Sequence, residues 1–227
     1  MKKLLLTFSL MVMAFVGFSQ IDFAVDTNKT TIDIQRPTFS ENANTVNGIQ
    51  LENGAFVLDT VEYGTMIRFG IGNRVELRTQ INWDTGFSVG VKVNLFQSTE
   101  RWMPDVAVLS FFDQNPDGAI MATDYRVVAD FDDMIDRLGV TLNYGKGINA
   151  FRLNGMENYF NAVVRYQVLN RVSAFGEVQV IGEDLNYNVG FIALANNNWA
   201  VDLHGGSMTM GDETSPFFGG GVSFAVR

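Results

Sequence analysis

The feature that most constrains the fold is a two-residue alternation of apolar and polar side chains over residues 66–96, MIRFGIGNRVELRTQINWDTGFSVGVKVNLF. A period of two is that of a β-strand, in which successive side chains point to opposite faces. Gly72-Asn73 and residues 84–86 interrupt the alternation, and both sequences favour the tight turns of β-hairpins. The segment therefore predicts three consecutive antiparallel strands with one apolar and one polar face.

The same period recurs along the rest of the chain, without a helical period longer than two turns. Counting the weaker stretches, the sequence predicts about twelve strands, with about ten as the alternative. They are expected at residues 48–58, 64–71, 74–83, 87–96, 105–112, 125–131, 137–144, 159–168, 172–181, 186–194, 199–206 and 217–226. The predicted fold class is therefore all-β, with antiparallel pairing throughout.

Residues 1–19 have the pattern of a secretory signal peptide. Lys2 and Lys3 precede an apolar run from Leu4 to Phe18, and Ser19 supplies a small residue for cleavage. A retained signal anchor is the alternative, although the residues that follow are polar. We expect cleavage after Ser19 and export from the cytoplasm.

Charge and cysteine content exclude several function classes. The formal net charge is −9, and removal of two signal-peptide lysines makes the mature chain more acidic still, which disfavours nucleic-acid binding. The chain has no Cys, so it can form neither a disulfide framework nor a thiolate metal site or nucleophile.

Alternation alone does not say which face points inward. A soluble barrel turns its apolar face inward, and a membrane barrel turns it to lipid. In a barrel of about eight strands, side chains only just fill the interior. A twelve-stranded barrel with an apolar lining would therefore enclose an empty cavity. A polar lumen can instead hold water and paired charges. We therefore predict a transmembrane β-barrel, with a soluble two-sheet β-sandwich binding an apolar ligand as the alternative.

Two further patterns are typical of outer-membrane barrels. Four of the five connections after even-numbered strands are expected to be short turns, residues 97–103 being the exception. Connections after odd-numbered strands include the longest expected loops, at residues 113–123, 145–157 and 207–215. Aromatic residues fall near predicted strand ends, where amphipathic rings favour the level of lipid headgroups. They are Tyr63, Trp83, Trp102, Tyr144, Tyr159, Trp199 and Phe224.

Three segments carry a resemblance to a known family: IQRPTFSENANTV at 34–46, IRFGIGNRVELR at 67–78 and WMPDVAVLSFF at 102–112. Together they resemble a family of outer-membrane transporters grouped with the MetA-pathway phenol-degradation proteins. The first is similar to an Asp-Arg-Pro segment, but Gln35 stands where an Asp is usual. The resemblance implies a small barrel in the outer membrane of a Gram-negative cell that passes small molecules, hydrophobic ones included.

No constellation of catalytic residues appears, so the chain is not expected to be an enzyme or to bind a cofactor. His204 is the only histidine, lacks a local serine elbow motif, and is expected to face the lumen with Asp202 as a wall residue. One His also disfavours a transition-metal site. The acidic residues between Asp130 and Asp136 lack the spacing of a calcium loop, so a solvated turn is the simpler interpretation.

The candidate functional residues are charged groups on predicted lumen faces, which would pair with one another or set the charge selectivity of a pore. They are Arg68, Glu76, Arg78, Lys92, Arg126, Arg165, Glu177 and Asp202. We divide the chain into a signal peptide at 1–19, a plug-like periplasmic segment at 20–47 and a barrel at 48–227. Arg36 is the plug candidate and would meet a wall carboxylate such as Glu76; a disordered tether is the alternative.

The sequence thus predicts an outer-membrane channel or uptake protein for small molecules that performs no chemistry. Its expected partners are outer-membrane lipid, the barrel-assembly machinery and a small-molecule solute, but not nucleic acid. A structural or adhesive barrel whose lumen is closed by its own salt bridges is the alternative function.

Overall fold

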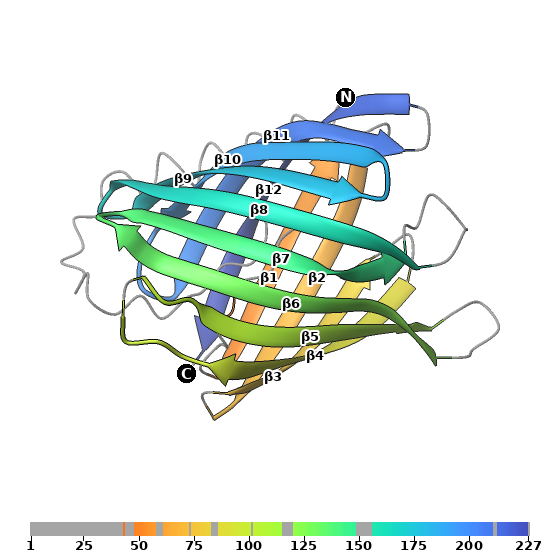
Figure 1. Ribbon diagram of the computed structural model, residues 1–227. Helices are drawn as coiled ribbons and strands as arrows, with labels where there is room; N and C mark the ends of the chain where they lie inside the picture. Colours follow the sequence, from red (N-terminus) through yellow and green to blue (C-terminus); the bar gives the residue numbers. More distant parts are fainter. Residues whose placement is uncertain are drawn as a thin grey trace.

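The chain forms a closed antiparallel β-barrel of twelve strands (Figure 1). The computed structural model describes residues 43, 48–57, 61–72, 74–82, 86–100, 102–114, 120–148, 156–210 and 213–226. Each strand pairs with its sequence neighbours, and β1 pairs with β12 to close the ring. The predicted fold class and strand number are confirmed, and the two-sheet sandwich alternative is wrong because the sheet closes on itself.

The strands are β1 (Ile49–Val57), β2 (Val61–Ile71), β3 (Val75–Asn82), β4 (Gly86–Phe96), β5 (Asp105–Gln114), β6 (Ile120–Ile135), β7 (Leu138–Ile148), β8 (Met156–Leu169), β9 (Val172–Ile181), β10 (Asp184–Leu194), β11 (Trp199–Met210) and β12 (Glu213–Val226). The even number of strands brings Ile49 and Val226 to the same end of the barrel. We call this end the terminal rim and the opposite end the loop rim. No helix among the described residues is long and apolar enough to cross a membrane.

The outward face is the apolar one. Along β2 the alternation leaves Ile67, Phe69 and Ile71 exposed, whereas Arg68 between them has no exposed surface. The same holds on β10, where Asn188 is buried and Val189 is 62% exposed. A soluble protein of this size would bury such side chains, because each contributes about 1.5–3 kcal/mol on leaving water. The inversion is the pattern of a barrel whose outer surface meets lipid.

Several strands are longer than the sequence predicts. β6, β8, β11 and β12 continue past the residues at which the alternation becomes irregular, so the long loops expected at 113–123, 145–157 and 207–215 are wrong. The connections there span only residues 115–119, 149–155 and 211–212. Backbone pairing tolerates these irregularities through register shifts, such as the one near Phe111 and Phe112 in the β5–β6 ladder.

Left-handed backbone appears at tight turns. Gly72 has a φ of 62° in the β2–β3 turn, as the hairpin signal predicts, and Gly182 has a φ of 58° between β9 and β10. Arg137 in the β6–β7 turn has a φ of 67° although it carries a side chain. Among the described residues it is the only non-glycine in this region, which costs about 1–2 kcal/mol for an ordinary residue.

The seam between β1 and β12 is built from small residues. Gly54 pairs with Gly221 and Ala55 pairs with Gly220, so these positions bring few side-chain atoms to the join. The seam is held mainly by its backbone hydrogen-bond ladder. It is also the only pairing in the ring between strands that are distant in the sequence.

The predicted aromatic positions divide between two environments. Trp102, Tyr144 and Trp199 are exposed, and Trp199 packs against Phe224 with ring centroids 4.4 Å apart. Tyr159 is 4% exposed and faces the lumen, so its assignment to a lipid headgroup level is wrong. The side chains of Tyr63 and Trp83 lie outside those that the structure describes.

Candidate functional site: a charged barrel lumen

A cluster of five charged side chains fills one side of the lumen, on strands β1 to β4. Glu76 is at its centre. Arg68 donates Nε to Glu76 Oε1 and Nη2 to Glu76 Oε2, both at 3.0 Å, in a bidentate pair. Arg78 Nε donates to the same Oε1 at 2.5 Å, and Lys92 Nζ lies 3.6 Å from Oε2. One carboxylate thus serves three cations.

Strand register explains why these groups meet. Arg68 pairs directly with Arg78, and Glu76 pairs directly with Lys92. Glu52 on β1 balances the surplus of positive charge, because Arg68 Nη1 donates to its Oε1 at 3.1 Å. Gln50 Nε2 donates to that same oxygen at 2.9 Å. The result is a network in which three cations share two carboxylates.

The members of the cluster are buried. Arg68, Glu76 and Lys92 have no exposed surface, and Arg78 is 1% exposed. Gln80 lies two positions nearer the loop rim on the same face and is exposed. The charged cluster is therefore shielded from solvent, whereas the same wall is exposed nearer the loop rim.

The opposite wall carries carboxylates bound mainly to uncharged polar groups. Thr141 Oγ1 donates to Asp130 Oδ1 at 2.6 Å between β7 and β6. Asn188 Nδ2 lies 3.4 Å from Glu177 Oε2, and Asn188 Oδ1 lies 3.3 Å from His204 Nδ1. Asp202 is buried on the same face of β11 as His204, as the alternation predicts.

A third cluster of polar side chains, formed by Asp124, Arg126 and Tyr159, lies closer to the loop rim. Arg126 Nε donates to Asp124 Oδ2 at 2.7 Å, and Tyr159 Oη donates to Asp124 Oδ1 at 2.8 Å. The Arg126 guanidinium also lies 4.8 Å from the centre of the Tyr159 ring, a cation–π distance. This contact ties β8 to β6 across β7 inside the barrel.

Toward the terminal rim the lumen lining becomes apolar. Val163, Phe175 and Ile192 form a buried cluster with two alanines of β11 and β12. Arg165 lies beside this cluster, directly paired with Phe175. Its Nε and Nη2 are buried and make no hydrogen bond within the described part of the chain.

Ala43 lies inside the barrel, ahead of the first strand. It has no exposed surface and packs against Ala107 of β5 and Val128 of β6, both of which face the lumen. The side-chain amide of Asn94 donates to its carbonyl oxygen at 3.1 Å. At Ala43 the chain therefore already lies within the lumen.

All eight charged residues predicted for the lumen lie on the inward face, but in separate groups. Arg68, Glu76, Arg78 and Lys92 form one network, Arg126 belongs to another, and Arg165, Glu177 and Asp202 belong to the wall between β8 and β11. Arg36, the plug candidate, lies outside the described residues. Sequence reasoning missed Glu52, Asp124 and Asn188, although the same inward parity would have found each of them.

Acidic side chains and the histidine of the described part of the lumen do not gather into a metal-binding group. No group of three or more His, Asp or Glu side chains there could hold a metal ion. The sequence predicts that the acidic run forms a solvated turn. Asp136 is exposed in the β6–β7 turn, but Asp130 is buried in the lumen, so that interpretation is wrong for Asp130. The arrangement pairs opposite charges along the inward face of the barrel.

Comparison with solved structures places the fold among bacterial porins. The KdgM porin is 12% identical and matches with a TM-score of 0.62 over 78% of this chain and 99% of that one. The NanC porin is 13% identical, with a TM-score of 0.59 over 79% of this chain and 100% of its own. Omp33 of Acinetobacter baumannii is 9% identical, with a TM-score of 0.51 over 82% and 100%.

These likenesses concern the fold alone. No family model and no curated protein matches the sequence. The chain is thus a twelve-stranded barrel with the architecture of outer-membrane porins.

Proposed function

We propose that this protein is a passive channel for small molecules in the outer membrane of a Gram-negative bacterium. The observation that carries the proposal is the inverted polarity of a closed barrel, apolar toward the outside and charged within. A lipid solvent favours such an outer surface, and a charged interior suits a hydrophilic passage. The terminal rim would then face the periplasm, with the loop rim on the cell surface.

The charge pattern of the lumen bears on what passes. The KdgM porin has also been solved in complex with disordered oligogalacturonate, a polyanionic sugar chain. In this protein the wall from β6 to β11 carries more carboxylates than cations, among them Asp130, Glu177 and Asp202. We infer a passage that favours neutral or cationic solutes over polyanions.

The segment before β1 would regulate the passage as a plug. Ala43 supports the proposal of a plug-like segment ahead of the barrel, because its contacts with Asn94, Ala107 and Val128 hold one point of that segment inside the lumen. Deletion of residues 21–44 should raise single-channel conductance and lower heat stability. Unchanged conductance and stability would leave the tether interpretation standing.

A second function is favoured by one specific observation, the complete burial of the Glu76 cluster. A lumen closed by its own ion pairs would suit a structural or adhesive barrel that transports nothing. Planar-bilayer recording of the purified full chain separates the two functions. Discrete steps of conductance support the channel, and a silent bilayer that contains inserted barrel supports the closed structural barrel.

Two finer proposals rest on the sequence. The segments at 34–46, 67–78 and 102–112 support a grouping with the MetA-pathway transporter family, and hence passage of hydrophobic molecules among others. A barrel of this kind would be inserted by the barrel-assembly machinery. Co-purification of the unfolded precursor with the barrel-assembly machinery is the direct test of this second proposal.

A further inference from the structure

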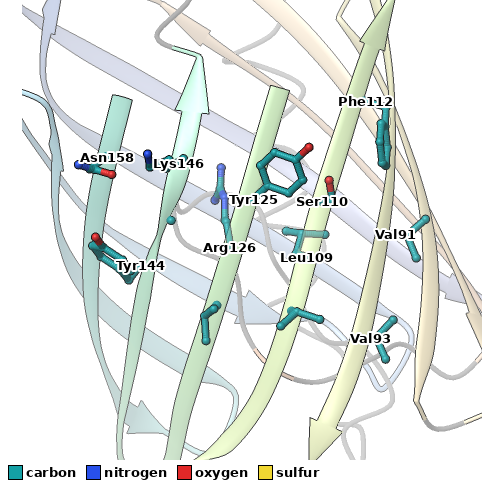
Figure 2. A pocket seen from close by; sticks show the side chains of 13 residues that line it. Val91, Val93, Leu109, Ser110, Phe112, Tyr125, Arg126, Tyr144, Lys146 and Asn158 are labelled. Carbon is teal, nitrogen blue, oxygen red and sulfur yellow. The ribbon is translucent and has the colours of Figure 1, made fainter. Parts of the chain in front are cut away.

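A groove of about 630 Å³ runs along the outer surface of the barrel over strands β4 to β8, on its lipid-facing side (Figure 2). This volume is within the range of about 300–1,000 Å³ that small-ligand sites occupy. Its floor is mainly aliphatic and aromatic, with Val91, Val93, Val108, Val127 and Tyr144 among its lining residues. These five side chains alternate outward, and Leu109 and Arg126 of the inward face also border the groove.

Two irregularities of the backbone lie beside the groove. The register shift in the β5–β6 ladder lies at Phe111 and Phe112, and such irregularities bend a sheet. On the next strand, a Cβ built on Gly145 would overlap the carbonyl oxygen of Tyr125. The absence of a side chain at Gly145 therefore lets β7 approach β6 closely at the centre of the groove.

Polar side chains form a single row across the groove. Ser110 pairs with Tyr125, Tyr125 pairs with Lys146, and Lys146 pairs with Asn158, so the four lie at one level on neighbouring strands. Figure 2 shows all four lining the pocket. Ser110 Oγ is buried and makes no hydrogen bond within the described part of the chain. The row thus places a cation and several hydrogen-bonding groups on a lipid-facing surface.

The adjacent row toward the terminal rim is apolar. Val93 pairs with Val108, Val108 with Val127, and Val127 with Tyr144. A polar row directly beside an apolar row reproduces the order of a lipid molecule, in which a headgroup adjoins an acyl chain. Lys146 is two positions from the end of β7 at Ile148, about 7 Å along the strand, which suits headgroup depth near the loop rim.

The charge of Lys146 stands out on this surface. Among the described strand residues that alternate outward, it is the only one with a charged side chain. A cation on a lipid-facing wall is costly unless it reaches the interface or an anion. An ammonium group also binds phosphate as a point charge.

We propose that the groove is a binding site for one lipid with a phosphate-bearing headgroup. The phosphate contacts Lys146 Nζ, with Asn158 and the Ser110 and Tyr125 hydroxyls as further donors, and an acyl chain lies along the valine row. The site is independent of whether solutes pass through the lumen. It would tie one lipid to the barrel wall near the loop rim.

Native mass spectrometry of the delipidated full-length protein tests this proposal. The probes are a phosphatidylglycerol and a diacylglycerol with the same acyl chains but no phosphate. We expect one phosphatidylglycerol to be retained per barrel, with diacylglycerol and Lys146→Gln each retaining about fivefold less, the effect of one cation near an anionic lipid. Arg137→Gln, at the opposite rim, is the matched control and should retain phosphatidylglycerol as the wild type does.

A second variant tests the apolar half of the site. Val108→Trp should fill the groove and reduce phosphatidylglycerol retention while Lys146 is still present, and heat-modifiable migration in gels would report that each variant is folded. Equal retention of the two lipids, or unchanged retention by Lys146→Gln, would overturn the proposal. Displacement of the lipid by millimolar inorganic phosphate would also overturn it, since the site would then bind free anions.

Discussion

Arg68 on β2 and Arg78 on β3 are directly paired in the lumen wall, and Glu76 binds both guanidinium groups. Like charges at paired positions oppose strand pairing. Glu76 therefore stabilises the β2–β3 pairing, which repulsion between Arg68 and Arg78 would otherwise oppose. The depth of the cluster strengthens this effect, because its members have almost no contact with water.

We expect Glu76→Gln to lower the free energy of unfolding by about 3–5 kcal/mol, since it leaves buried cations without their shared partner. Urea unfolding in lipid vesicles, followed by tryptophan fluorescence, measures the change. Glu100→Gln, in an exposed part of the β4–β5 connection, is the matched control and should behave as the wild type does. An unfolding midpoint that is equally unchanged in Glu76→Gln would contradict this account of the cluster.

The carboxylates on the wall between β9 and β11 predict the sign of ion selectivity. The double variant Glu177→Gln and Asp202→Asn removes two negative charges from the lumen, so cation preference should fall. The reversal potential across a bilayer with a salt gradient measures this shift. Asp136 lies at the terminal rim and its side chain is 87% exposed, so Asp136→Asn should leave the reversal potential nearly unchanged. An unchanged reversal potential in the double variant would place these groups outside the conducting path, and a shift toward cations would contradict the predicted sign.

Gly145 is predicted to tolerate no side chain. In Gly145→Ala the new methyl group would overlap the Tyr125 carbonyl oxygen, and moving a paired backbone should cost about 1–3 kcal/mol. Gly176→Ala on β9 is the control, because nothing lies within 4 Å of the position that its methyl group would take. Thermal unfolding of both variants in one detergent gives the comparison. Equal melting temperatures would show that β7 can move away from β6 without cost.

The two faces of β3 and β4 should respond in opposite ways to a charge. Val91 faces outward near the middle of β4, so Val91→Arg should destabilise the membrane-inserted barrel by about 2–4 kcal/mol. Gln80→Arg places the same side chain on an inward-facing, exposed position and should be tolerated. Folding yield into vesicles measures both, and equal yields would mean that the faces have been assigned the wrong way round.

The β6–β7 turn offers a stabilising substitution. Arg137 has a left-handed backbone that glycine adopts freely, so Arg137→Gly should raise the free energy of unfolding by about 1 kcal/mol. Arg171→Gly, in the turn before β9, is not among the positions with positive φ and should give no such gain. If the two variants shift the unfolding midpoint alike, backbone strain at Arg137 is not the cause.

The alternation in the sequence was sufficient to predict the twelve strands and the inward face of the charged residues. Ile67, Arg68 and Phe69 show why, since a period of two assigns every residue of a strand to one face once a single residue is placed. The same parity assigned Arg165 and Asp202, which lie far from the first hairpins. Face assignment in a regular sheet is thus a local property of the sequence.

Register is not local, and it decides which charges meet. The sequence places Arg68, Arg78 and Glu76 on one face. It does not predict that Arg68 pairs with Arg78, nor that Arg68 contacts Glu52. Strand ends are also poorly marked, because β6 continues beyond Phe131 through a register shift that breaks the alternation. Tyr159 shows a related failure, since its position near a strand end suggested lipid although its parity placed it in the lumen.

The glycine-rich seam of the ring has a consequence for the order of assembly. Every other pairing joins consecutive strands and can form as a hairpin, but the seam joins Ile49 to Val226 and needs the whole chain. Until then β1 and β12 both expose unpaired backbone groups, which invite pairing with other chains. Gly54, Gly220 and Gly221 contribute no side chains to the β1–β12 pairing. Closure of the barrel therefore depends on aligning the backbones of these two edge strands in the correct register. Both edges of the incomplete sheet therefore remain open to pairing with other chains until β12 joins β1.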